Sequence, residues 1–161
     1  MKTKGFIGLG VMGFPMAGHI SKAYPTQVYN RSLSKAKDWV DLYSGTIALS
    51  PEEMGNACEE IFMCIGNDDD VREVVSGEKG LLKSLKSGSI IVDHTTTSAK
   101  LSKEMSDFCS EKGVHYIDAP VSGGQAGADN GSLTIMAGGK EEPFNIACET
   151  MSCYSKFYKL M

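Results

Sequence analysis

The sequence predicts an α/β fold in which helices cover both faces of a doubly wound, mostly parallel sheet. Three observations lead to this prediction. Short apolar runs alternate with amphipathic stretches along the chain, these runs lack the polar alternation of a half-exposed sheet, and the segments between them are long enough for crossover helices. With 161 residues, of which 42% are hydrophobic and 22% charged, the chain is expected to form one globular domain, residues 1–161.

The first half of the chain predicts four strands and four helices in alternation. Strands are expected where apolar residues run together, at 4–9, 27–29, 46–48 and 61–65, and helices where apolar residues recur every three or four positions. The expected helices span 12–24, follow a capping Ser32 up to Tyr43, begin at Ser50 and span 68–76. The carboxylates at 68–70 open the last of these helices, where they complement the helix dipole and cap free N–H groups; a metal site is the alternative.

The second half continues the alternation until a glycine-rich stretch interrupts it. Strands are expected at 89–92, 114–117, 133–137 and 154–160, and helices at 98–112 and 141–151. Gly113 closes the first of these helices. No linker, repeat or low-complexity segment divides the chain.

Composition narrows the classes of function. The formal net charge is −4, from 16 basic and 20 acidic residues with no basic block, which argues against a nucleic-acid surface as the main function. No apolar run reaches the length of a membrane span, and glycines and Pro15 interrupt an N-terminal stretch that superficially resembles a signal peptide. Five cysteines without a Cys-x-x-Cys pair indicate neither a disulfide framework nor a zinc site, so we expect no metal and a reducing, cytoplasmic location.

A glycine pattern lies between the first expected strand and the first expected helix. The run Gly8-Leu9-Gly10-Val11-Met12-Gly13 reads G-x-G-x-x-G. In such a strand–turn–helix unit the first glycine allows the tight turn, the second lets a pyrophosphate approach the backbone, and the third lets helix and strand pack closely. We therefore predict a dinucleotide site here; a tight turn without a ligand is the alternative.

The end of the second expected strand bears on the choice of cofactor. NAD sites usually have Asp or Glu about 20 residues beyond the glycines, where the carboxylate bonds the ribose 2′-OH. This chain has Asn30, Arg31 and Ser32 there. A guanidinium and a hydroxyl suit a 2′-phosphate and no carboxylate repels it, so we predict NADP in preference to NAD. Two alternatives for Arg31 stay open, stacking on adenine without discrimination and a solvated surface position.

A second glycine cluster lies at Asp118–Gly139, which reads DAPVSGGQAGADNGSLTIMAGG. A Ser-Gly-Gly turn after a strand offers a hydroxyl and closely spaced backbone N–H groups, the components of a carboxylate-binding site. The residues alone leave a flexible loop open as the alternative.

Three ordered motifs together resemble the N-terminal domain of the β-hydroxyacid dehydrogenases, the 3-hydroxyisobutyrate dehydrogenase and tartronate semialdehyde reductase group. FIGLGVMGFPMAGHI (Phe6–Ile20) is similar to the family's cofactor signature, DHTTT (Asp93–Thr97) resembles its Asp-x-Ser-Thr segment, and Asp118–Gly139 resembles its substrate-loop signature. The resemblance runs from about Lys4 to the C-terminus. It implies a Rossmann-type domain of an oxidoreductase that transfers hydride between NADP or NAD and a small β-hydroxy acid or semialdehyde acid.

Carried over by position, the resemblance assigns roles to single residues. It implies that Ser122, Gly123 and Gly124 bind the substrate carboxylate. Gly66 stands where the family commonly has the proline of a Leu-Pro pair, which implies a less rigid loop here. The residues expected to contact the cofactor are Gly8, Leu9, Gly10, Val11, Met12, Gly13, Asn30, Arg31, Ser32, Ile65, Gly66 and Thr96.

The family's catalytic lysine and its helical second domain have no match in this sequence. In the family this lysine follows the last strand of the first domain, so we expect it beyond Met161. Lys156 and Lys159 stand in no matching context and are expected to be exposed strand-end charges. We therefore expect residues 1–161 to bind the cofactor but to turn over poorly or not at all. The resemblance also implies that the full-length form is a homo-oligomer.

Several alternatives to a 3-hydroxyisobutyrate dehydrogenase-like function stay open. A 6-phosphogluconate dehydrogenase usually has Asp-Gly-Gly-Asn-Ser where this chain has Asp93–Thr97, and imine reductases share the first motif but generally lack the Ser-Gly-Gly loop. A noncatalytic dinucleotide-binding module is the alternative of another class, which the absent lysine supports. Beside these motifs, we expect Asp93 to anchor its loop and His94 to cap a helix or contact solvent rather than the cofactor.

Overall fold

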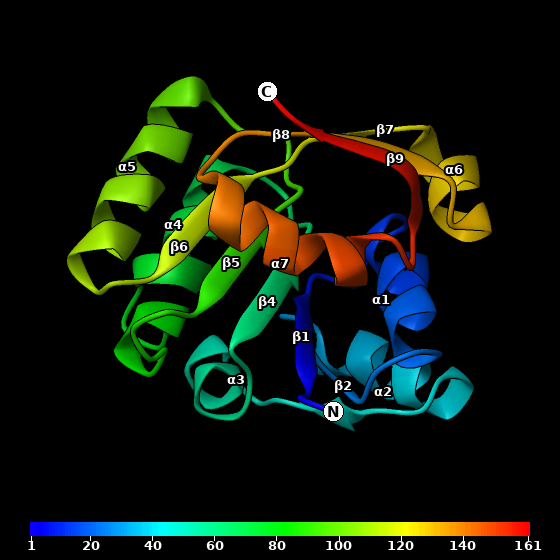
Figure 1. Ribbon diagram of the computed structural model, residues 1–161. Coiled ribbons are helices and arrows are strands. Elements are labelled where there is room, and N and C mark those ends of the chain that lie inside the picture. The colour runs from blue at the N-terminus through cyan, green and yellow to red at the C-terminus, as the bar shows by residue number, and fades with distance from the viewer.

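The computed structural model describes residues 1–161 and contains a six-stranded sheet with helices on both faces (Figure 1). The strand order is β3-β2-β1-β4-β5-β6, and every pair is parallel. This is the order of the dinucleotide-binding α/β fold, and it reverses between β1 and β4. The strands are β1 (Lys4–Ile7), β2 (Thr26–Tyr29), β3 (Thr46–Ile47), β4 (Glu60–Met63), β5 (Ile90–Asp93) and β6 (His115–Asp118). The predicted fold class is confirmed.

Helices connect these strands and cover both faces of the sheet. They are α1 (Gly13–Ser21), α2 (Leu33–Leu42), α3 (Pro51–Ala57), α4 (Asp68–Ser76), α5 (Ala99–Glu111) and α7 (Glu141–Met151), with a short 3₁₀ turn at Leu81–Lys83. Successive strand residues point to opposite faces. Phe6 and Phe62 therefore join the core under α1, α2 and α7, whereas Ile7 and Ile61 join the core under α3, α4 and α5.

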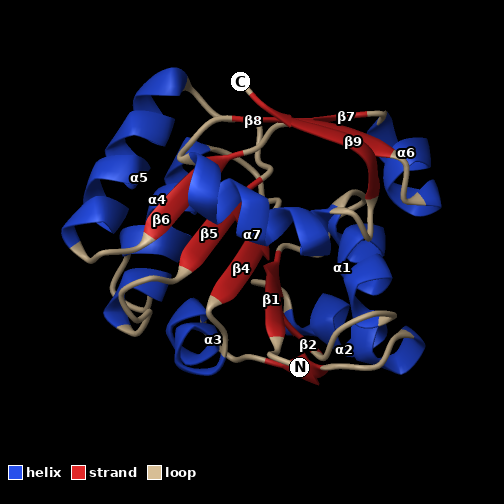
Figure 2. Cartoon of the chain, in the orientation of Figure 1, coloured by secondary structure: helices blue, strands red, loops and turns tan.

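Three strands form a separate small sheet, which the sequence pattern did not distinguish from the main one. They are β7 (Val121–Ser122), β8 (Leu133–Ala137) and β9 (Ser155–Leu160), with β7 antiparallel and β9 parallel to β8. In Figure 2 these strands run across the top of the view, apart from the main sheet. The glycine-rich stretch between β7 and β8 contains a short helix, α6 (Gly124–Asn130), rather than only a loop.

Local capping explains several of the helix starts. The Ser50 hydroxyl accepts a hydrogen bond from the Glu53 N–H at 3.0 Å, and the Asn67 side chain accepts one from the Asp70 N–H at 3.0 Å. The carboxylates at 68–70 lie in the first turn of α4, where they complement the helix dipole as predicted. The prediction that they also cap this helix is wrong, because the preceding Asn67 does so. Ser32 lies at the expected N-cap of α2, but its hydroxyl is 2.9 Å from the hydroxyl of Ser34 and makes no cap bond.

His94 links the main sheet to the small sheet. Its Nδ1–H donates to the Ala119 carbonyl at 2.7 Å, and its Nε2 accepts from the Tyr154 hydroxyl at 2.6 Å. The ring is only 2% exposed, and burial lowers the His94 pKa to about 4, so the imidazole is neutral. Neither helix capping nor solvent contact, the two expected roles, describes this residue.

No helix of the chain combines the length and the apolar character needed to cross a bilayer.

Candidate functional site

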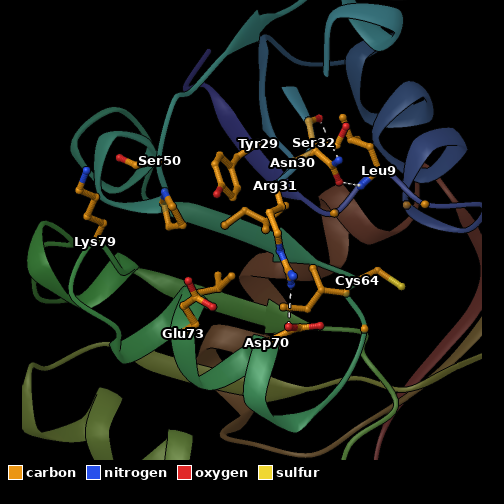
Figure 3. Close-up of a pocket in the computed structure, with 18 of the residues that line it drawn as sticks. Leu9, Tyr29, Asn30, Arg31, Ser32, Ser50, Cys64, Asp70, Glu73 and Lys79 are labelled. Carbon is orange, nitrogen blue, oxygen red and sulfur yellow. Dashed lines mark hydrogen bonds and ion pairs between the residues drawn. The ribbon is translucent and has the colours of Figure 1, made fainter. Parts of the chain in front are cut away.

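A cavity of about 780 Å³ opens at the carboxyl ends of β1, β2 and β4 (Figure 3). It lies where the strand order reverses, which is where open α/β sheets bind ligands. Its volume falls within the range of small-molecule sites, roughly 300–1,000 Å³. The residues predicted to contact a cofactor line it with the exception of Thr96; those present are Gly8, Leu9, Gly10, Val11, Met12, Gly13, Asn30, Arg31, Ser32, Ile65 and Gly66.

The three glycines of the first motif differ in what surrounds them. Gly8 has φ +100°, and a Cβ there would lie 2.1 Å from the Cys64 carbonyl oxygen; a Cβ at Gly13 would lie 1.9 Å from the Gly8 carbonyl oxygen. These two glycines are therefore required by the turn and by close packing. A Cβ at Gly10 would meet no atom within 4 Å. The backbone at Gly10 thus borders open space in the cavity, which is where a phosphate has to approach.

The turn before α1 also presents unused hydrogen-bond donors. The backbone N–H groups of Gly10, Val11 and Met12 donate to no acceptor within the chain. They precede the N-terminus of α1, which has no acidic residue in its first turn. Free N–H groups and the positive end of a helix dipole together favour a bound anion. The arrangement therefore fits the pyrophosphate of a dinucleotide.

The residues after β2 form the opposite wall of the cavity. The Asn30 Oδ1 accepts a hydrogen bond from the Leu9 N–H at 2.9 Å, which ties this wall to the glycine turn. The Arg31 Nη2 lies 2.6 Å from Asp70 Oδ1, and Figure 3 shows this ion pair reaching from the residues after β2 to α4. The hydrogen bond to Asp70 raises the pKa of Arg31, so the guanidinium is charged at any physiological pH. No carboxylate occupies the end of β2 itself.

The loops after β4 and β5 are joined by side-chain bonds. The Thr95 hydroxyl accepts a hydrogen bond from the Ile65 N–H at 2.9 Å, and the Thr95 N–H donates to Asp93 Oδ1 at 2.9 Å. Asp93 also accepts from the Tyr116 hydroxyl at 2.5 Å, and burial raises the Asp93 pKa. Asp93 thus anchors its loop as expected. Thr96 is exposed and does not line the cavity, so its assignment to the nicotinamide side stays a prediction.

The second glycine motif lies next to α1, away from the cavity lining. Ser122, Gly123 and Gly124 are exposed, and both glycines have positive φ, +127° and +61°. The Gly123 N–H donates to no acceptor in the chain. The following helix, α6, packs on α1, where the His19 Nε2 lies 3.0 Å from the carbonyl oxygens of both Ala128 and Asp129.

Further residues line the cavity that the sequence did not single out. They come from the ends of β1 to β4, from the loop before α3 and from α4 and the turn after it: Ile7, Tyr29, Leu49, Ser50, Pro51, Cys64, Asp70, Glu73, Val74, Glu78 and Lys79. Most of them follow parallel strands, and this position in the sequence could have indicated them as cavity residues, because the carboxyl ends of such strands meet at one edge of the sheet. Burial raises the Cys64 pKa to about 11, so its thiol stays protonated at neutral pH.

Lys156 and Lys159 are exposed on β9, as predicted, and do not line the cavity.

Comparison with known proteins agrees with this geometry. The family described as the NAD binding domain of 6-phosphogluconate dehydrogenase matches residues 3–161. An uncharacterized oxidoreductase of Shewanella frigidimarina is 46% identical over 162 residues, covering 100% of this chain and 56% of that protein. The mitochondrial 3-hydroxyisobutyrate dehydrogenase of Mus musculus is 37% identical over 150 residues, covering 92% of this chain and 44% of the enzyme.

A solved structure agrees over almost the whole chain. Psf3 in complex with NADP⁺ and 2-OPP superimposes with a TM-score of 0.92 at 28% identity, covering 98% of this chain and 56% of Psf3. The chain thus spans about half the length of the proteins it matches. The chain belongs to the family of the NAD binding domain of 6-phosphogluconate dehydrogenase, and its relatives include the 3-hydroxyisobutyrate dehydrogenases that its motifs resemble.

Proposed function

We propose that residues 1–161 form a single domain that binds NADP(H) and presents it for hydride exchange with a small β-hydroxy acid or semialdehyde acid. The observation that carries this proposal is the run of free N–H groups at Gly10, Val11 and Met12 beside open space in the cavity. Every helix start leaves N–H groups without an intrahelical partner, but here three consecutive ones line a cavity of nucleotide-binding size, at the glycine turn where a pyrophosphate can approach the backbone.

Different residues of the cavity bind different parts of the nucleotide. The free N–H groups bind the pyrophosphate, with α1 supplying the positive end of its dipole. Arg31 and Ser32 bind the 2′-phosphate at the end of β2, where the strand end itself carries no acidic residue. Asn30 holds the glycine turn against this wall through Leu9. Ile65 and Gly66 bound the nucleotide on the side of β4.

The substrate carboxylate is assigned to Ser122, Gly123 and Gly124. The Ser122 hydroxyl and the free Gly123 N–H supply two donors for it. His19 bonds the carboxyl end of α6, the helix that follows this loop, and so holds α6 against α1. The bound nicotinamide supplies or accepts the hydride.

Proton exchange on the substrate oxygen falls to a lysine outside residues 1–161, as the resemblance implies. A missing general acid typically lowers the rate about 10²- to 10⁴-fold. We propose a homo-oligomeric full-length enzyme, and a cytoplasmic location remains our expectation from the unpaired cysteines.

Isothermal titration of the 161-residue chain with NADPH, followed by an assay with NADP⁺ and 3-hydroxyisobutyrate, tests the proposal. The expected result is one NADPH bound per chain with little or no turnover. Absence of NADPH and NADH binding would contradict the proposed cofactor site. Turnover at the rate of an ordinary dehydrogenase would contradict the assignment of the general acid to residues outside this chain.

A further inference from the structure

The ion pair between Arg31 and Asp70 joins two walls of the cavity. Arg31 follows β2, whereas Asp70 lies in the first turn of α4, after β4, and both side chains line the cavity. The Arg31 Nη2 and Asp70 Oδ1 are 2.6 Å apart. The guanidinium proposed to receive a 2′-phosphate therefore already has an anionic partner within the protein.

The two partners are not equally fixed. The Arg31 side chain is 76% exposed, so little packing holds it in one conformation, whereas the Asp70 side chain is only 23% exposed. The Asp70 backbone is also held, because its N–H donates to the Asn67 side chain at the helix cap. Asp70 is thus the fixed member of the pair, and Arg31 is the member that can turn toward a ligand.

Resting on the proposed function, we infer that Asp70 is a specificity-determining residue that competes with the 2′-phosphate of NADP(H) for Arg31. The ion pair uses one nitrogen of the guanidinium, Nη2. A phosphate that pairs with the same edge of the planar donor fork needs that nitrogen, so the two anions compete for it. NADH has no 2′-phosphate and gains nothing from this exchange. Asp70 therefore lowers the preference for NADPH over NADH without contacting the reacting atoms.

The neighbouring carboxylates show why this role belongs to Asp70 alone among the three aspartates that open α4. Asp69 pairs with Arg72 on its own helix, at 2.8 Å, and its side chain is 89% exposed. Asp68 accepts hydrogen bonds from the N–H and hydroxyl of Ser98. Neither of them lines the cavity. Asp69→Asn therefore makes the same change in net charge as Asp70→Asn without releasing Arg31.

Titration calorimetry with NADPH and with NADH on four proteins tests this inference: the unmodified chain, Asp70→Asn, Asp69→Asn, and Asp70→Asn in an Arg31→Ala background. Asp70→Asn should tighten NADPH binding about 1.5- to 5-fold, the range set by the loss of an exposed ion pair, and leave NADH binding unchanged. Asp69→Asn should leave the ratio of the two dissociation constants unchanged. In the Arg31→Ala background, Asp70→Asn should no longer alter that ratio.

The outcomes separate the inference from the function on which it rests. If neither nucleotide binds the unmodified chain, the proposed function fails and the inference fails with it. If both bind but Asp70→Asn leaves the ratio unchanged or lowers it, only the inference is wrong. A persistent effect of Asp70→Asn without Arg31 would also overturn it, because the charge would then act directly on the ligand.

Discussion

The Asn30 side chain accepts a hydrogen bond from the Leu9 backbone N–H at 2.9 Å, across 21 residues of sequence. Leu9 is only 1% exposed, so water cannot readily replace this bond. The contact fixes the glycine turn, which we propose binds the pyrophosphate, against the residues after β2, which we propose face the adenosine ribose. One side chain thus couples the geometry of two parts of the proposed nucleotide site.

Two substitutions of Asn30 should separate the effect of its hydrogen bond on stability from the effect of charge at this position on cofactor selectivity. Asn30→Asp keeps an acceptor for the Leu9 N–H but adds a negative charge where a 2′-phosphate is expected. The ratio of NADPH to NADH affinity, measured by calorimetry, should therefore fall by roughly ten-fold or more. Asn30→Ala is the matched control: it leaves the buried N–H unpaired and should lower the free energy of unfolding by about 1–3 kcal/mol. Unchanged selectivity in Asn30→Asp would show that this position does not face the ribose.

Gly10→Ala should weaken nucleotide binding without destabilising the fold. The added methyl group meets no protein atom within 4 Å, so the melting temperature should stay within the scatter of the unmodified chain. It occupies the space beside the free N–H groups, so the dissociation constant for NADPH should rise at least about ten-fold, the loss expected of one charge-assisted hydrogen bond. Gly138→Ala is the control, because its Cβ would be 4.0 Å from its nearest neighbour, the Asp118 carbonyl oxygen, and it does not line the cavity. An unchanged dissociation constant for NADPH in Gly10→Ala would show that the pyrophosphate does not bind beside Gly10.

His94 should make the stability of the chain depend on pH. Its pKa falls from 6.5 to about 4 on folding, so below pH 6.5 the unfolded chain binds a proton that the folded chain does not. Stability is therefore fully present above pH 6.5 and is lost as the pH falls toward 4, by about 3 kcal/mol in all. Urea unfolding from pH 4 to 7.5 should show this loss, and His94→Gln should show a flatter profile. Because Asp93, with its raised pKa, is common to both proteins, an identical profile in His94→Gln would exclude His94 as the source.

His19→Ala should loosen α6 without altering the nucleotide site. His19 is the side chain of α1 that bonds the carbonyls at the end of α6. Without it, amide hydrogen exchange should become faster over Gly124–Asn130, while NADPH affinity stays the same. Ser21→Ala removes a bond within α1 itself, to the Gly18 carbonyl, and serves as the control. Equal exchange in the two variants would show that His19 does not hold α6.

Elements with a regular local pattern could be predicted closely from the sequence. The strand at Leu133–Ala137 and the helix at Glu141–Met151 have the predicted bounds, because apolar runs and helical periodicity are local properties. The helix α6 was not predicted, since glycines weaken the helical signal over Gly124–Asn130. The separation into two sheets was also missed, because strands of both sheets carry the same kind of apolar run and strand pairing is a long-range property.

The candidate site likewise contains residues that a local motif predicted and residues that only the fold brings together. The glycine turn and the end of β2 were predicted because each is a short motif with its own mechanism. The facing Asp70 lies 39 residues from Arg31, and within the sequence it reads only as one of three carboxylates at a helix start. His94 read as a polar residue beside a threonine run, whereas its partner Tyr154 lies 60 residues away. Contacts of this kind depend on the completed fold.

Parallel calorimetric titration of the unmodified chain with NADPH and NADH shows whether the cavity binds a dinucleotide and whether Arg31, at the end of β2, receives the 2′-phosphate. The predicted result is saturable binding of both nucleotides, one per chain, with the smaller dissociation constant for NADPH. Equal or tighter binding of NADH would contradict the assignment of Arg31, and binding of neither would contradict the site itself.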